Sequence, residues 1–195
     1  MEFDITSKIE YENNQIEYGC FLGNNKIVYI KAGMGGSYLG YEDKYLKIAN
    51  RLNKKYGCSV VCVSNPVPLS ITADEIIIGK FINDHDIQNP QMFFFGHSNG
   101  CLKGLELGLG EIPFTKMVLV NMPLMLNFHK TVQWIASMPN TDIVAVYGET
   151  DPSYRYIPFL QNKNLQNVEI VKVDGADHHF KGMLERFIEL SEMVF

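Results

Sequence analysis

The sequence predicts an α/β protein: a three-layer α/β/α sandwich with a mostly parallel, twisted sheet and an antiparallel N-terminal hairpin at one edge. Short runs rich in β-branched and aromatic residues alternate with segments whose apolar residues recur every three or four positions. Clusters of Gly, Asn and Pro separate these runs. Such alternation favours parallel strands that are covered by helices on both faces.

The first elements are expected to be extended. Residues 3–11 alternate between apolar and polar side chains, Asn13-Asn14 can form a turn, and residues 16–22 return as a second strand. Residues 26–30 form a short, β-branched apolar run, as expected of a strand that is buried on both faces.

Strand–helix units follow to the end of the chain. Strands are expected at 59–63, 91–95, 116–120, 143–147 and 168–173, and helices at 41–56, 101–109, 156–160 and 181–193. Gly57 is the expected stop of the first helix, and Ser70 or Thr72 is the expected N-cap of a further helix before Pro90. No repeat or long linker interrupts the chain, so one domain over 1–195 is expected.

The composition limits the classes of partner. The 195 residues include 17 Lys and Arg against 22 Asp and Glu, which gives a formal net charge of −5. Nucleic acids and anionic membrane surfaces require clustered positive charge, so neither is expected as the main partner. At 46% apolar and 20% charged residues, the chain is typical of globular proteins.

Compartment and redox chemistry follow from the same sequence. The four cysteines, at 20, 58, 62 and 101, have the spacing of neither a disulfide framework nor a zinc site, and they are interpreted as buried thiols. The N-terminus lacks the basic start and apolar core of a signal peptide, and the stretch 117–128 is too short to cross a bilayer. A cytoplasmic protein without a membrane span is expected.

A glycine-flanked serine follows the third strand of the parallel series. Gly96-His97-Ser98-Asn99-Gly100 matches G-x-S-x-G at a strand-to-helix turn. A nucleophile at such a turn needs a strained backbone, and small residues two positions away on either side leave room for it. The alternative is a glycine-rich turn with a helix-capping serine.

A serine nucleophile requires a base, and the base requires an orienting acid. Asp151 follows the strand ending at residue 147, and Glu149 is a rival acid in the same loop. His178 and His179 follow the strand ending at residue 173, and adjacent side chains point in different directions, so at most one serves Ser98. Loops after parallel strands meet at one edge of the sheet, which makes a shared site possible.

At these residues the chain resembles the α/β-hydrolase family over nearly its whole length. The resemblance rests on the Gly96–Gly100 turn, on Tyr147-Gly148-x-x-Asp151, on Gly175-Ala176-Asp177-His178 and on Gly33-Met34-Gly35-Gly36-Ser37. It implies the α/β-hydrolase fold, with Ser98 as nucleophile, Asp151 as acid and His178 as base. It also implies an oxyanion hole made by the backbone N–H groups of Met34 and Asn99, although Ala32 stands where family members often have His.

The resemblance also bears on the substrate. Many family members insert a helical cap where this chain has only the interval 121–141, which leaves room for one or two short helices. A nearly capless hydrolase with an open cleft is therefore expected. Tyr38, Met122 and Met125 are candidates to line it and would suit a modest, uncharged acyl group.

Other chemistries fit the residues less well. The crowded acids and histidines of 174–179 do not have metal-ligand spacing, and the glycines of 33–40 lack the lysine of a phosphate-binding loop. No cofactor and no metal are expected.

The expected function is hydrolysis of a carboxylic ester, or of a thioester or small amide, through an acyl-enzyme on Ser98. One alternative is a catalytically silent binding protein with the same fold, and another is a lyase or perhydrolase that uses the same three residues. The sequence leaves the oligomeric state open.

Overall fold

The computed structural model describes residues 1–66 and 71–195 and contains one eight-stranded sheet in the order β1-β2-β4-β3-β5-β6-β7-β8. Strands β3 (Asn24–Lys31), β4 (Cys58–Val63), β5 (Gln91–His97), β6 (Phe114–Val120), β7 (Asp142–Gly148) and β8 (Val168–Val173) are parallel. Strands β1 (Ile5–Tyr11) and β2 (Asn14–Phe21) form an antiparallel hairpin at one edge. The predicted fold class is confirmed.

The hairpin turn differs from the prediction by one residue. Tyr11 pairs with Asn14, so the turn consists of Glu12 and Asn13. Both have positive φ angles, of 48° and 61°, the combination whose twist matches that of the two strands. Asn14 belongs to the second strand, and its side chain donates to the Glu12 carbonyl oxygen at 2.8 Å.

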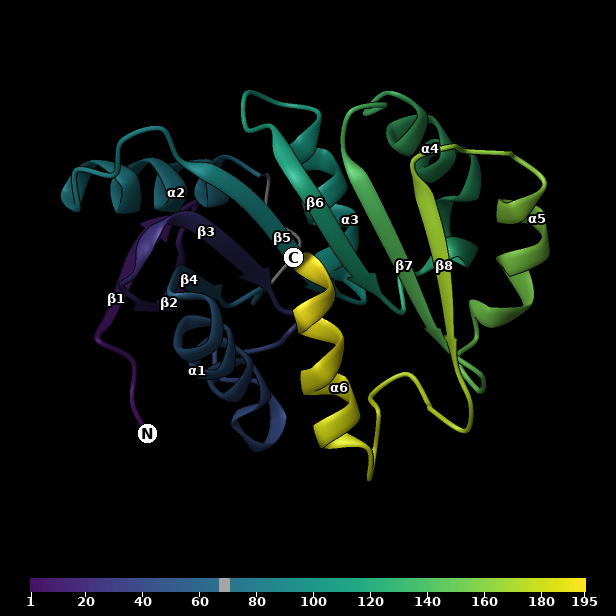
Figure 1. Cartoon of the computed structure of the whole chain (residues 1–195), viewed down its shortest axis with the longest axis horizontal. Helices are drawn as coiled ribbons and strands as arrows, with labels where there is room; N and C mark the ends of the chain where they lie inside the picture. The colour runs from purple at the N-terminus through teal and green to yellow at the C-terminus, as the bar shows by residue number, and fades with distance from the viewer. Residues whose placement is uncertain (67–70) are drawn as a thin grey trace.

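Helices cover both faces of the sheet, and each face has its own apolar core (Figure 1). Helices α1 (Lys44–Tyr56) and α6 (Leu184–Leu190) pack on one face, where Ile48, Leu52 and Phe187 are fully buried. Helices α2 (Thr72–Asp84), α3 (Asn99–Gly108), α4 (Leu124–Ala136) and α5 (Ile157–Gln161) pack on the other. The three predicted layers are therefore present.

Two helix starts differ from the expectation. The helix expected from residue 41 is split: a 3-10 turn at Tyr41–Asp43 contains left-handed φ angles of 52° at Glu42 and 55° at Asp43, and α1 begins only at Lys44. It ends as predicted at Gly57, whose N–H bonds to the Asn53 carbonyl oxygen. Thr72 is the first residue of α2 rather than its N-cap, and Ser70 lies outside the described residues.

The later helices also differ in length. Helix α3 begins at Asn99, immediately after Ser98, because Ser98 itself turns the chain out of β5. The interval 121–141 holds the single helix α4, which is kinked at Asn127. The terminal helix is shorter than expected, since α6 gives way to a 3-10 turn at Ser191–Val194.

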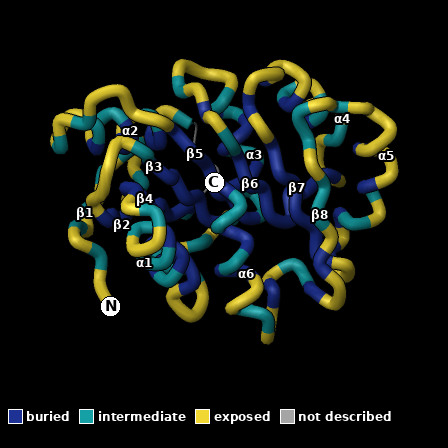
Figure 2. Tube along the Cα trace, viewed as in Figure 1, coloured by how far each residue is buried: buried dark blue, intermediate teal, exposed yellow. Residues whose placement is uncertain are grey.

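The central strands β3 to β7 are mostly buried, whereas β1 has no buried residue and β8 only one (Figure 2). Strand β4 is buried at every residue, and β7 at every residue after Asp142. Polar groups needed for chemistry are therefore expected at the carboxyl ends of the strands, in the loops that follow β5, β7 and β8.

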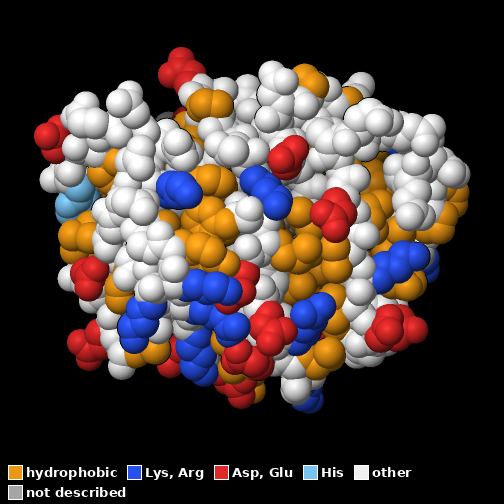
Figure 3. All heavy atoms as spheres, viewed as in Figure 1, with side chains coloured by type: hydrophobic (Ala, Val, Ile, Leu, Met, Phe, Trp, Pro, Cys, Tyr) orange, Lys and Arg blue, Asp and Glu red, His pale blue; other side chains and the backbone are white. Residues whose placement is uncertain are grey.

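The surface carries mixed charge on the face formed by α1 and α6, where Lys and Arg side chains lie among Asp and Glu side chains (Figure 3). Arg51 and Lys55 of α1 both pair with Glu192, and Arg51 also pairs with Glu185. Among the described helices, none is both long and apolar enough to span a membrane.

Candidate active site

Ser98 lies at the tight turn between β5 and α3. Its φ and ψ are 56° and −126°, a backbone conformation that non-glycine residues rarely adopt. Neighbouring backbone leaves no room for side chains beside this turn: a Cβ at Gly100 would lie 2.3 Å from the Lys31 carbonyl oxygen, and one at Gly96 would lie 3.0 Å from the Cys101 backbone. Both flanking glycines are therefore required by contact with neighbouring atoms, as the sequence predicts.

Three side chains from three loops form one hydrogen-bonded chain. His178 Nε2 lies 2.9 Å from Ser98 Oγ, and His178 Nδ1 lies 2.5 Å from Asp151 Oδ2. Ser98 follows β5, Asp151 follows β7 and His178 follows β8, so the parallel strands bring together residues that are up to 80 positions apart in the sequence. The arrangement can pass a proton from a hydroxyl to an imidazole that a carboxylate orients.

The carboxylate of Asp151 is buried and held in place. Asp151 is 4% exposed, and its second oxygen accepts the backbone N–H of Ser153 at 2.6 Å. A buried carboxylate needs such partners, and here one oxygen is left for the imidazole. An ionised carboxylate can only accept hydrogen bonds, so His178 Nδ1 carries the proton that it donates to Asp151. His178 Nε2 is then free to accept the hydrogen bond of the Ser98 hydroxyl.

The two rival residues occupy other positions. Glu149 is exposed, and its carboxylate accepts the N–H of Gly175 at 2.8 Å, which ties the loop after β7 to the loop after β8. His179 is exposed and lines the cleft without a hydrogen bond to Ser98. Geometry thus favours Asp151 and His178 over their neighbours.

Two further residues hold the backbone of His178. The carbonyl oxygen of His178 accepts from Asn121 Nδ2 at 3.0 Å and from His97 Nε2 at 2.8 Å. Asn121 also accepts the N–H of Gly148 at 2.9 Å, so it links the acid loop to the base loop. Burial lowers the pKa of His97 well below its usual value, and the ring stays neutral.

The glycine-rich loop after β3 faces the turn at Ser98. Met34 and Asn99 both line the cleft that contains Ser98, and within residues 1–66 and 71–195 neither backbone N–H has a hydrogen-bond acceptor. Asn99 is also the first residue of α3, where the helix dipole favours negative charge. Two free donors beside a hydroxyl are suited to an oxyanion.

Asn65 joins this loop to the serine turn. It is 3% exposed, its backbone pairs with Gly36 as an isolated β-bridge, and its Nδ2 donates to both Ala32 O and Asn99 Oδ1 at 3.1 Å. Neither Asn65 nor Asn121 is among the site residues predicted from the sequence. Asn121 directly follows β6, and Asn65 lies two residues after the end of β4. A polar residue shortly after a buried strand is the same pattern that points to Ser98, Asp151 and His178.

The cleft has a volume of about 700 Å³. Met34, Tyr41, Pro123 and Leu126 contribute to its lining. The residues predicted to bind substrate do not. Met122 is fully buried in the core, Tyr38 packs against Phe3 at a ring distance of 5.8 Å, and Met125 is not among the lining residues. Pro123 and Leu126, from the predicted interval 121–141, line the cleft instead.

Other reactive groups are buried or scattered. The four cysteines are free and buried, as predicted, and burial raises the pKa of Cys58 to about 11 and that of Cys20 to about 12, so these thiols are protonated. Within the described part of the chain, no three His, Cys, Asp or Glu side chains are grouped to hold a metal ion.

Comparisons with known proteins identify the fold. No protein-family model matches the chain, and no curated protein sequence matches it significantly. Among solved structures, Est1E from Butyrivibrio proteoclasticus matches with a TM-score of 0.74 at 12% identity, covering 96% of each chain. An alpha-beta serine hydrolase homologue from Coxiella burnetii matches with a TM-score of 0.69 at 16% identity, over 98% of this chain and 97% of that one.

A third match is the thioesterase domain from the curacin biosynthetic pathway, with a TM-score of 0.69 at 13% identity, over 97% of this chain and 99% of that one. At such identities the likeness concerns the fold. The chain has the α/β-hydrolase fold, and the matched proteins include a serine hydrolase homologue and a thioesterase domain.

Proposed function

We propose that this protein is a serine hydrolase of the α/β-hydrolase family that cleaves carboxylic esters, or the related thioesters, through an acyl-enzyme on Ser98. The proposal rests on one observation, the hydrogen-bonded chain from Ser98 Oγ through His178 to the buried carboxylate of Asp151. Solved structures with the same fold include a serine hydrolase homologue and a thioesterase domain, which supports hydrolysis as the reaction class.

In the first half-reaction, Ser98 Oγ attacks the carbonyl carbon of the ester while its proton moves to His178 Nε2. Asp151 holds the imidazole in the tautomer that accepts this proton and stabilises the imidazolium that results. His178 then donates the proton to the departing alkoxide or thiolate, and the acyl group remains on Ser98. Because the fold already holds these three side chains together, no entropy is lost in bringing the catalytic groups to one another during the reaction.

The negative charge that develops on the carbonyl oxygen needs donors. The free N–H groups of Met34 and Asn99 line the same cleft as Ser98 and serve this role. The loss of one such donor typically costs about 2.7–4 kcal/mol of transition-state stabilisation. Asn65 keeps the two donors in register, since it bonds to the glycine-rich loop and to the Asn99 side chain.

In the second half-reaction, water enters the open cleft and gives a proton to His178 Nε2 as its oxygen attacks the acyl carbon. The proton returns to Ser98 Oγ when the carbon–oxygen bond breaks. Acid and free serine are the products. The same groups act in reverse order, so the site needs no further residue to complete the cycle.

A fluorophosphonate probe tests the nucleophile. The wild-type protein is expected to be labelled at Ser98 and to hydrolyse a short-chain nitrophenyl ester, and Ser98→Ala should lose both properties while it remains folded. Ser137→Ala is a matched control, because Ser137 is an exposed serine directly after α4 whose hydroxyl donates to the Gln133 carbonyl oxygen. Persistent labelling of Ser98→Ala would overturn the assignment.

A second experiment separates this function from a silent binding protein with the same fold. Folded wild-type protein that neither reacts with the probe nor turns over any ester or thioester would favour the binding protein. Asp151→Asn distinguishes them further, because it should lower kcat by about 10⁴-fold through the wrong imidazole tautomer. A protein that only binds its ligand would have no ester or thioester hydrolysis for Asp151→Asn to lower.

A further inference from the structure

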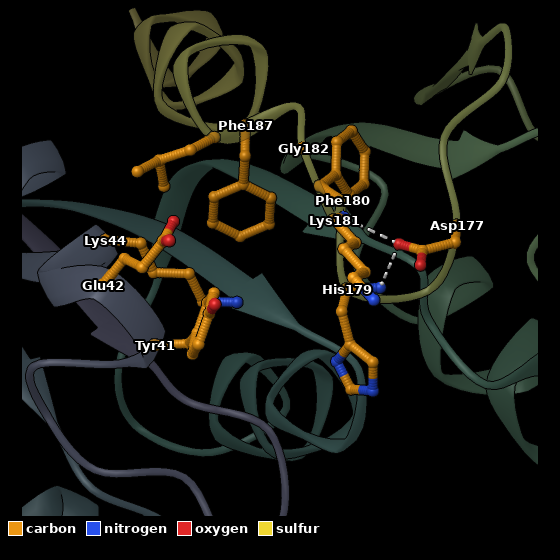
Figure 4. Close-up of a pocket in the computed structure, with 10 residues that line it drawn as sticks. Tyr41, Glu42, Lys44, Asp177, His179, Phe180, Lys181, Gly182 and Phe187 are labelled. Carbon is orange, nitrogen blue, oxygen red and sulfur yellow. Dashed lines mark hydrogen bonds between the residues drawn. The ribbon is translucent and has the colours of Figure 1, made fainter.

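A second pocket, of about 330 Å³, lies next to the cleft that contains Ser98. It is formed by the start of α1, the loop after β8 and α6 (Figure 4). Tyr41, Lys44 and His179 line both cavities, so a molecule bound at Ser98 can extend into this pocket.

The unusual group in the pocket is Lys44. Its residue is only 7% exposed, and Figure 4 shows its side chain reaching from α1 into the space between Phe187 and His179. Among the described residues, its ammonium has no hydrogen-bond acceptor and no ion-pair partner. Its contacts are with aromatic faces, at 4.4 Å from the Phe187 ring centre and 5.1 Å from that of Tyr45.

Such a cation is unfavourable in the free protein. Lysine side chains are rarely buried without a partner, because desolvation of an ammonium is costly. Burial lowers the pKa of Lys44 to about 8, because desolvation disfavours the charged ammonium. Lys44 is moreover the first residue of α1, where the helix dipole disfavours a positive charge and no acidic residue stands in the first turn.

The carboxylates of the pocket do not neutralise Lys44. Glu42 is exposed and makes no ion pair with it. Asp177 accepts the backbone N–H groups of His179 at 3.0 Å and of Lys181 at 2.9 Å, which bind its carboxylate to its own loop. A positive charge, a helix N-terminus and an apolar wall thus face one enclosed space.

We propose that this pocket binds a carboxylate carried by the ester substrate, with Lys44 Nζ as its counter-ion. The proposal rests on the ester hydrolysis proposed above and names the substrate class: half-esters of short dicarboxylic acids. Phe180, Leu184 and Phe187 supply apolar contacts for the methylene chain between the carboxylate and the ester. This proposal differs from the uncharged acyl group expected from the sequence because it takes account of Lys44 in the wall of the pocket.

A pair of esters of equal chain length tests the charge. Monoethyl adipate carries the carboxylate and ethyl hexanoate does not, and the ratio of their kcat/KM values measures the preference. We expect the wild type to prefer the anionic ester by at least tenfold, mainly through KM, and Lys44→Met to reduce the ratio tenfold or more. Lys47→Met, which removes a charge from the same helix outside both pockets, should keep the wild-type ratio. A wild type without preference, or an unchanged ratio in Lys44→Met, would overturn the proposal.

Binding measured without turnover separates this proposal from the proposed hydrolysis. Adipate should bind to Ser98→Ala by isothermal titration, adipamide should bind at least tenfold more weakly, and Lys44→Met in the same background should lose the difference. If adipate binds in this way but no ester is cleaved, the proposed hydrolysis fails and the carboxylate pocket stands. If esters are cleaved but adipate and adipamide bind alike, the carboxylate pocket fails and the hydrolysis stands.

Discussion

The side-chain amide of Asn121 donates to the carbonyl oxygen of His178 at 3.0 Å and so fixes the backbone from which the imidazole projects. The same amide donates to the Asp177 carbonyl oxygen at 3.1 Å, and its oxygen accepts the N–H of Gly148. Asn121 is fully buried and stands at the end of β6, between the strands that carry Ser98 and Asp151. We therefore expect Asn121 to act as a positioning residue for His178.

Asn121→Asp should impair catalysis. The added carboxylate oxygen would face two carbonyl oxygens that now accept hydrogen bonds, so the loop carrying His178 would shift. Misplacement of a reacting group by about 1 Å costs on the order of 100-fold in rate, and we expect such a loss of kcat/KM on a nitrophenyl ester.

The matched control is Asn167→Asp. Asn167 also donates to two carbonyl oxygens, those of Met138 and Thr141, but at the opposite ends of the strands. Its substitution should lower the free energy of unfolding without lowering kcat/KM. Equal kinetics in the two variants would contradict a positioning role for Asn121.

Gly100→Ala should destabilise the fold strongly. The new methyl group would lie 2.3 Å from the Lys31 carbonyl oxygen and 2.6 Å from that of Ala32, both backbone atoms that cannot move away without shifting β3. We expect a loss of about 3 kcal/mol in urea unfolding. Gly79→Ala in α2 meets no atom within 4 Å and should instead gain about 1 kcal/mol from helix propensity. Similar stabilities of the two variants would contradict this account of the serine turn.

Acid should destabilise the protein through His97. Burial holds its folded-state pKa well below the usual 6.5, so below about that pH the unfolded state binds a proton that the folded state does not. Stability is therefore unaffected by His97 above pH 6.5 and falls as the pH decreases, by at most about 1.4 kcal/mol per pH unit. Urea unfolding at pH 7.5 and pH 5 should show a smaller acid loss in His97→Gln, which can still donate to the His178 carbonyl oxygen. An identical acid loss in both proteins would exclude His97 as its source.

Lys44→Met should stabilise the protein at neutral pH. The variant removes a buried ammonium whose pKa is lowered to about 8 and keeps an apolar chain against Phe187, and we expect a gain on the order of 2 kcal/mol after the lost cation–π contact.

The gain should depend on pH in a defined direction. The folded protein releases the Lys44 proton near pH 8 and the unfolded chain near 10.5, so the wild type recovers stability between these values and the advantage of Lys44→Met shrinks. Glu42, Asp177, His97, His179 and Lys181 surround this site and remain in both proteins, so the comparison cancels their titration. A variant less stable than wild type at pH 7 would contradict the cost assigned to this lysine.

The fold class and the loops that carry the candidate reactive residues could be predicted because both follow from local pattern. Apolar runs mark buried strands, parallel topology brings their carboxyl ends to one edge, and polar residues directly after those runs must lie there. This pattern identifies Ser98 and the two loops after β7 and β8, whereas the resemblance to the α/β-hydrolase family selects Asp151 over Glu149 and His178 over His179. The hairpin turn was displaced by one residue because Glu12-Asn13 and Asn13-Asn14 are nearly equivalent locally and the pairing of Tyr11 with Asn14 decides between them.

The lining of the cleft and the burial of Lys44 depended on contacts between segments far apart in the chain. Met122, just before α4, enters the core and Leu126, in its first turn, lines the cleft, and the apolar pattern of this segment does not specify which of its side chains faces which side. Lys44 is enclosed because α6 and the loop after β8 close over the start of α1, more than 130 residues away in the sequence. Local residue order sets which groups can react, whereas packing across the sheet sets what they face, because burial is a property of neighbours that the local sequence does not contain.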